Sequence, residues 1–214
     1  FRSVPLFFCE YIALGNTSFE RQKSYRVLFD NYVERYDFLK EIIVLKQNPL
    51  KIWSAGCSTG EEPITLAMIM QEKSKIYSIF GSDISTKVIN KAKKAIFTTD
   101  KTKDIPDNLL KKYFNKKTED KKITYKAKEI LTKNIKYAQI NFMSSNYGIS
   151  NVFDIIFFRN VLIYFNIETQ KEILHKILKH LKPGGHLFIG HSEAIYEHSM
   201  PIKNVNPSVY LKDK

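Results

Sequence analysis

Two adjacent carboxylates follow a turn of small residues in the segment WSAGCSTGEEP, residues 53–63. An apolar stretch, a glycine-containing turn and a helix start form the pattern of a nucleotide-binding turn, which usually holds phosphate. Glu61 and Glu62 would repel a phosphate, and no Lys follows Gly60 as in a P-loop. ATP and NAD are therefore disfavoured. A cationic ligand would be attracted, and S-adenosylmethionine (SAM) carries an ammonium and a sulfonium but no phosphate.

The same two glutamates also have a purely structural interpretation. Thr59 and Glu62 stand three residues apart at a helix start, as do Ser58 and Glu61, and either pair could form a capping box. Acidic residues in a first helical turn also complement the helix dipole. Because capping explains one glutamate as well as ligand binding does, both interpretations stay open for Glu62.

A third acid, Asp83, ends the next apolar stretch, 23 residues after Gly60. In dinucleotide-binding folds, an acid roughly 20 residues after the glycine-rich turn accepts hydrogen bonds from the ribose hydroxyls. The alternative is a helix N-cap within SDIST, since Asp, Ser and Thr all cap well. Ribose binding is the favoured interpretation, because a strand-end acid lies on the ligand edge of an open sheet.

These acids need a scaffold that brings strand ends together, and the apolar pattern predicts one. Apolar stretches of strand length alternate with segments of helical periodicity, which predicts an α/β fold with parallel strands and crossover helices. The predicted strands are 50–55, 75–84, 135–142, 153–158, 186–190 and about 208–212. The predicted helices are 22–45, 61–73, 86–94, 105–114 and 167–181, with KPGG as a stop signal after the last.

A lysine-rich insertion at about 96–136 interrupts this alternation. Between Lys87 and Lys136, sixteen lysines stand against six acids, which is +10 of the formal net charge of +12. Ile123 and Tyr125 alternate with polar neighbours as in a half-exposed strand, so we expect a small β-subdomain. Its surface is either a docking face for an anionic partner or a solvated face.

Composition narrows the class of protein further. A chain of 214 residues has room for one domain with a small insertion, and no apolar stretch reaches the roughly 20 residues that span a bilayer. We therefore expect a cytoplasmic protein. Only two cysteines, Cys9 and Cys57, occur, and the five histidines lack metal-ligand spacing, so no metal is predicted.

Three segments together resemble one family. KIWSAGCSTGEEPITLAM, FFRNVLIYF and LKPGGHLFIGHSE, preceded by NTSFER, look like the chemotaxis receptor methyltransferases of the CheR type. In that family SAM methylates glutamate side chains on the cytoplasmic helices of bacterial chemoreceptors, leaving S-adenosylhomocysteine (SAH). The resemblance implies a doubly wound, mostly parallel seven-stranded sheet of the Rossmann-like methyltransferase type with a small antiparallel insertion.

The resemblance also implies roles for individual residues. Arg21 and Tyr164 would flank the transferred methyl group as the catalytic pair. Glu61 would hold the ammonium of SAM, and Asp83 its ribose. The full cofactor-binding set is Thr17, Arg21, Glu61, Asp83, Asn141, Phe142, Arg159 and Asn160. A glutamate substrate, with an ordinary pKa of about 4.3, is already ionised at neutral pH, so catalysis would consist mainly of aligning oxygen, methyl carbon and sulfur.

Domain boundaries and partners follow from the same resemblance. Residues 1–47 would be a helical lead-in, the remnant of an N-terminal helical domain, and 48–214 the catalytic domain with its insertion at about 96–136. The partners would be the cytoplasmic helices of chemoreceptors, which would recruit the protein to membrane-bound receptor clusters. In some members the insertion binds a peptide at the receptor's C-terminus, and lysines suit such an acidic tether.

Two alternatives remain. The lysines and a pI near 9.5 are typical of a nucleic-acid methyltransferase, but the segment Arg159-Asn160-Val161 lacks the Asn/Asp-Pro-Pro-aromatic element that holds a flipped base. No cluster of aromatics among the lysines is placed to stack bases. The other alternative is a receptor-associated binding module without catalysis, which would have no need for Arg21, Glu61, Asp83, Asn160 and Tyr164 together.

Overall fold

The computed structural model describes residues 39, 41–46, 49–150, 152–195 and 200–213. Most of the predicted helix 22–45 lies outside the described residues, as do the predicted site residues Thr17 and Arg21. The described part of that helix, 41–45, is helical. Among the described helices, none combines the length and the apolar character that a bilayer crossing requires.

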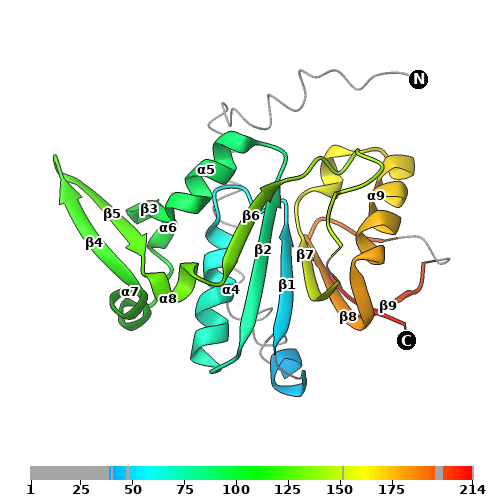
Figure 1. Cartoon of the computed structure of the whole chain (residues 1–214), viewed down its shortest axis with the longest axis horizontal. Coiled ribbons are helices and arrows are strands. Elements are labelled where there is room, and N and C mark those ends of the chain that lie inside the picture. Colours follow the sequence, from blue (N-terminus) through cyan, green and yellow to red (C-terminus); the bar gives the residue numbers. More distant parts are fainter. Residues whose placement is uncertain (1–38, 40, 47–48, 151, 196–199, 214) are drawn as a thin grey trace.

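A seven-stranded sheet forms the centre of the molecule, in the order β6-β2-β1-β7-β8-β10-β9 (Figure 1). Strands β6, β2, β1, β7 and β8 pair in parallel, whereas β10 is antiparallel to both β8 and β9. The strands are β1 (Leu50–Ala55), β2 (Tyr77–Asp83), β6 (Ile135–Gln139), β7 (Phe153–Phe158), β8 (Leu181–Ile189), β9 (Ile202–Asn206) and β10 (Val209–Lys212). The predicted mostly parallel, seven-stranded α/β fold is confirmed.

Helices cover both faces of this sheet because successive side chains of each strand point to opposite sides. In β1, the buried Ile52 belongs to an apolar cluster with helix α4 (Glu61–Glu72). Its neighbour Trp53, also buried, belongs to a second cluster with helix α9 (Ile167–Lys179). The sheet is therefore doubly wound, with a core on each face.

The insertion forms a separate antiparallel sheet in the order β3-β5-β4, which Figure 1 shows beyond the β6 edge of the main sheet. Its elements are β3 (Ile96–Thr98), α6 (Thr99–Thr102), α7 (Asp107–Tyr113), β4 (Phe114–Glu119), β5 (Lys122–Ala127) and α8 (Glu129–Thr132). Phe97, Phe114 and Leu131 join the apolar cluster of α4. The predicted small antiparallel sheet is thus present, and it is packed against α4.

Most element boundaries lie close to the sequence prediction, but strand β6 ends at Gln139 and not at residue 142. Helix α5 (Thr86–Lys94) matches the predicted 86–94. Helix α9 ends at Lys179, just before KPGG, but strand β8 begins at Leu181 and not at residue 186, so KPGG lies inside a strand. Gly184 has φ 69°, and the pairing with β7 shifts register after Phe153, so the strand absorbs these residues as an irregularity. The edge strand β9 was not predicted.

Candidate functional site

Every predicted site residue that the structure describes lies at the edge where the carboxyl ends of β1, β2, β6 and β7 meet. Open parallel sheets bind ligands outside these strand ends. The described site residues are Glu61 after β1, Asp83 at the end of β2, Asn141 and Phe142 after β6, and Arg159, Asn160 and Tyr164 after β7. The sheet topology therefore brings together residues up to 103 positions apart in the chain.

The turn after β1 is closed by two glycines in the left-handed region, Gly56 with φ 85° and Gly60 with φ 93°. A Cβ at Gly56 would lie 2.5 Å from Val161 Cγ2, and one at Gly60 would lie 2.9 Å from Ala92 Cβ. Both glycines are thus required by backbone conformation and by close packing. The turn lies tightly between α5 and the segment that follows β7.

Asp83 is tied to this turn by its carboxylate. Oδ2 accepts a hydrogen bond from the Ser58 N–H at 3.0 Å, and Oδ1 accepts one from the Ser85 N–H at 3.0 Å. Burial raises the pKa of Asp83, although these backbone hydrogen bonds act in the opposite direction. The N-cap of α5 is Ser85, whose Oγ accepts from the Val88 N–H, so the alternative role of Asp83 as the cap is not observed.

The two adjacent glutamates have different surroundings. The N-cap of α4 is Gly60, with no side-chain capping hydrogen bond, so neither predicted capping box forms. Glu62 is buried, accepts a hydrogen bond from Ser54 Oγ at 2.6 Å, and pairs with Arg159 Nη1 at 3.5 Å. Glu62 therefore joins the start of α4 to the end of β7 inside the protein.

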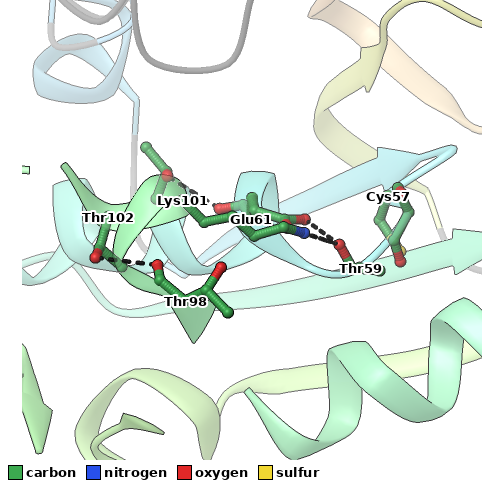
Figure 2. Close-up of polar contacts among 8 residues, drawn as sticks. Cys57, Thr59, Glu61, Thr98, Lys101 and Thr102 are labelled. Carbon is green, nitrogen blue, oxygen red and sulfur yellow. Dashed lines mark hydrogen bonds and ion pairs between the residues drawn. The ribbon is translucent and has the colours of Figure 1, made fainter. Parts of the chain in front are cut away.

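Glu61 is held by a different set of groups (Figure 2). Its carboxylate accepts from Thr59 Oγ1 at 2.6 and 2.8 Å and forms an ion pair with Lys101 Nζ. Lys101 Nζ also donates to Thr59 Oγ1 at 2.8 Å. Lys101 belongs to helix α6 of the insertion, so the insertion reaches the carboxyl edge of the main sheet. The sequence analysis missed this residue because nothing distinguishes Lys101 from the other fifteen lysines of its region.

The segment after β7 is held by a second residue that the sequence analysis missed, Glu193. Its Oε2 accepts from the Gly190 N–H at 2.6 Å and the Asn160 N–H at 2.9 Å, and its Oε1 from the Ile163 N–H at 3.3 Å. Asn160 has φ 56°, a left-handed conformation that asparagine tolerates. The buried carboxylate therefore fixes the backbone that carries Asn160 and Tyr164.

The remaining predicted residues differ in exposure. The ring of Phe142 is buried and packs against Phe158, Tyr147 and Trp53, with ring centroids 5.1, 5.7 and 6.3 Å away. Asn141 is exposed, and its Oδ1 accepts from the Met143 N–H at 2.9 Å. Tyr164 ends the 3₁₀ helix η1 (Leu162–Tyr164) and is 46% exposed. Phe142 thus supports the core, while Asn141 and Tyr164 face outward.

Two other groups bear on the chemistry of the edge. Cys57 is buried, and burial raises the pKa of its thiol, so it remains protonated at neutral pH and packs as a small apolar group. In the part of the chain that the structure describes, no three His, Cys, Asp or Glu side chains are grouped as a metal site would need.

Comparison with known proteins agrees with this geometry. Residues 16–211 match the family model for the CheR methyltransferase, SAM binding domain. The chemotaxis protein methyltransferase of Borreliella burgdorferi is 33% identical over 208 residues, 94% of this chain and 72% of that protein. That of Escherichia coli is 37% identical over 147 residues, 67% and 51% of the two chains. That of Salmonella typhimurium is 32% identical over 169 residues, 77% and 59% of the two chains.

The doubly wound sheet, with acids at its carboxyl edge, defines the class of the domain as a Rossmann-like α/β fold, and the family model identifies its ligand as SAM. The chain belongs to the CheR methyltransferase family through its SAM binding domain. The predicted resemblance and the predicted cofactor are therefore confirmed. The chain spans between about half and 72% of the length of these three relatives.

Proposed function

We propose that this protein transfers the methyl group of SAM to glutamate side-chain carboxylates of bacterial chemoreceptors, with SAH as the other product. The observation that carries the proposal is the match of residues 16–211 to the CheR SAM binding domain, combined with Glu61 and Asp83 at one edge of the sheet. The relatives are named chemotaxis protein methyltransferases, which supports chemotaxis as the setting and receptors as the substrates.

The acids of the edge suit SAM. Glu61 pairs with the α-ammonium, and Asp83, whose carboxylate is half-buried at the end of β2, accepts hydrogen bonds from the ribose hydroxyls. Asn141 contacts the adenine, and the buried Phe142 ring holds the backbone of that contact in place. Glu62 links Ser54 to Arg159 inside the protein, so we assign it a structural role and not a part in binding.

The segment after β7 forms the other wall of the cofactor site. Arg159 acts from inside the protein through its ion pair with Glu62, and Asn160 presents its amide to the cofactor. Thr17 and Arg21 complete the methionine end of the site, and residues 1–47 and 48–214 form the helical lead-in and the catalytic domain. These assignments follow the family pattern.

The bound SAM supplies an electrophilic methyl group, and the residues of the protein supply alignment. The substrate carboxylate is ionised at neutral pH, so no general base is needed. Tyr164 and Arg21 hold that carboxylate on the line through methyl carbon and sulfur, with the reacting atoms about 3 to 3.5 Å apart. Arg21 keeps its charge at any relevant pH, and the exposure of Tyr164 gives a protein substrate access to the methyl group.

The lysine-rich insertion supports an acidic protein partner. Its sixteen lysines, counted with those of α5, raise the local concentration of the acidic receptor helices and speed their encounter with the site. The insertion also binds an acidic peptide at the receptor's C-terminus. Docking on receptors places the protein at membrane-bound clusters without insertion into the bilayer.

Transfer of labelled methyl groups tests the proposal. The protein is incubated with methyl-labelled SAM and membranes that contain chemoreceptors, and the products are treated with mild alkali. Label released as methanol identifies a carboxyl methyl ester and supports the proposal. Alkali-stable label, or label in added RNA or DNA, overturns it. Receptors in which the accepting glutamates are replaced by alanine serve as the control and should take up no label.

A further inference from the structure

Lys101 occupies the position that the proposed function gives to the ammonium of SAM. Its Nζ contacts both groups available there, the Glu61 carboxylate and, at 2.8 Å, Thr59 Oγ1 (Figure 2). The α-ammonium of SAM is the same chemical group as a lysine ammonium, a compact cation with three N–H donors. The two cations therefore compete for one carboxylate.

The burial of this carboxylate explains why a substitute cation is needed. Glu61 is 6% exposed, and the side chain of Lys101 is 20% exposed. A carboxylate removed from water without a counter-ion is strongly destabilising. Thr59 supplies a hydrogen bond but no charge, so Lys101 supplies the compensating charge.

Lys101 lies outside the main sheet, so its contact with Glu61 joins the insertion to the catalytic domain's sheet edge. It lies in the four-residue helix α6, between β3 and α7 of the insertion. Thr102 Oγ1 of that helix donates to the carbonyl of Thr98 at 3.3 Å, so this hydroxyl makes its hydrogen bond within the insertion (Figure 2). Apolar packing holds the insertion against α4, and the Lys101 ion pair adds a polar contact between α6 and the start of α4.

We infer that Lys101 is an internal substitute for the ammonium of the cofactor, and that SAM displaces it and releases α6 from Glu61. The inference rests on the proposed cofactor site and adds a regulation to it: the insertion stays packed on α4, while its Lys101 side chain pairs with Glu61 until SAM takes that place. Because binding must break an existing ion pair, Lys101 lowers the affinity for any ligand that carries an ammonium at this point.

Calorimetric titration with two ligands tests the competition. SAH carries the ammonium, whereas 5′-methylthioadenosine has the same nucleoside and a thioether but no amino-acid end. In Lys101→Met, the SAH dissociation constant should fall about tenfold relative to the unaltered protein, because the ligand now supplies the missing counter-ion. The dissociation constant of 5′-methylthioadenosine should change less than about twofold.

A matched control separates this effect from a change in net charge. Lys103 is exposed and caps the C-terminal end of the same helix, but among the described residues it makes no hydrogen bond or ion pair with Glu61 or Thr59. Lys103→Met should leave the SAH dissociation constant within about twofold. If Lys101→Met binds SAH more weakly, Lys101 is a ligand of the cofactor's carboxylate and the inference is wrong. Unchanged SAH binding by Lys101→Met would also overturn the inference.

A labelling experiment tests the displacement without any substitution, so it stands even where Lys101→Met fails to fold. The unaltered protein is acetylated on its amines, and each lysine is quantified by mass spectrometry with and without SAH. Lys101 should react faster when SAH is bound, while Lys103 reacts equally in both states. If Lys101 reacts equally fast with and without SAH, the inference about Lys101 is wrong, but the proposed function is unaffected. Failure of the unaltered protein to bind SAH overturns the proposed function itself, which is a distinguishable result.

Discussion

The turn after β1, residues 56–62, and the segment after β7, residues 159–164, both end a parallel strand at the same edge, yet they are held in different ways. The first combines a contact within the turn, where Thr59 donates to Glu61 two residues away, with contacts to Asp83 and Lys101, which lie 25 and 40 residues from their partners. The second is fixed from 30 and 33 residues away by Glu193, which accepts from the backbones of Ile163 and Asn160. A glycine-containing turn with several side-chain partners forms one wall of the site, and a single distant carboxylate holds the backbone of the other.

The two walls are also joined to each other. Glu62 of the first pairs with Arg159 of the second at 3.5 Å, and a Cβ on Gly56 of the first would meet Val161 of the second. Both features lie inside the protein, so the two segments pack directly against each other. Variants can separate the support that each segment receives.

The largest expected effect is the loss of the distant support. Glu193→Ala would leave three backbone N–H groups without their carboxylate, and we expect the free energy of unfolding to fall by about 3 to 4 kcal/mol. Urea denaturation measures this loss. Glu193→Gln keeps one acceptor oxygen and should lose about 1 to 2 kcal/mol.

The Gln variant also tests whether Glu193 is a positioning residue. If Glu193 positions Asn160 and Tyr164, Glu193→Gln should lower kcat for methyl transfer about tenfold or more, beyond any effect on the fraction folded. Unchanged kcat in a folded Glu193→Gln variant would show that the carboxylate supports the fold alone.

A smaller effect is expected from breaking the link between the walls. Arg159→Met would leave Glu62 buried without its cation, and we expect a loss of about 3 kcal/mol in unfolding free energy. The double variant Arg159→Met, Glu62→Gln removes the unpaired charge and should regain most of that loss in a double-mutant cycle. If the effects of Arg159→Met and Glu62→Gln simply add in the double variant, the pair contributes nothing to stability.

The comparison of the two walls also explains what the sequence could predict. The first wall is contiguous, so its glycines, its acids and Asp83 were found from spacing, and the helix 86–94 was predicted to the residue. The alternation of Ile52 and Trp53 between two cores follows from strand periodicity alone. Local propensity and regular apolar patterns therefore predict the parallel sheet and the position of the site.

What the sequence did not reveal depends on contacts between distant residues. Glu193 and Lys101 act over 30 and 40 residues, and their surroundings in the chain resemble those of other surface acids and lysines. The strand β8 was misplaced because KPGG has the composition of a stop signal, yet pairing with β7 and β10 overrides it. Tertiary pairing decides such positions, and a single sequence does not display it.

The smallest expected change in stability concerns Asp83 of the first wall, where folding and binding favour opposite charge states. Burial raises its pKa, so the folded protein holds this proton more readily than the unfolded chain does. The ionised form thus destabilises the fold. Relative to Asp83→Asn, the unaltered protein should lose stability as the pH rises from about 3.9, the ordinary pKa of Asp, through the raised pKa, and its stability should then level off.

Binding of SAH should show the reverse dependence on pH, because the ionised Asp83 carboxylate is the stronger acceptor for ribose hydroxyls. The SAH affinity of the unaltered protein should fall as the pH drops below the raised pKa, whereas that of Asp83→Asn should be about tenfold weaker at pH 7 and lack this dependence. Urea denaturation from pH 4 to 7 measures the change in stability, and calorimetric titration over the same range measures the SAH affinity. If the affinities of the two proteins change in parallel with pH, Asp83 does not bind the cofactor.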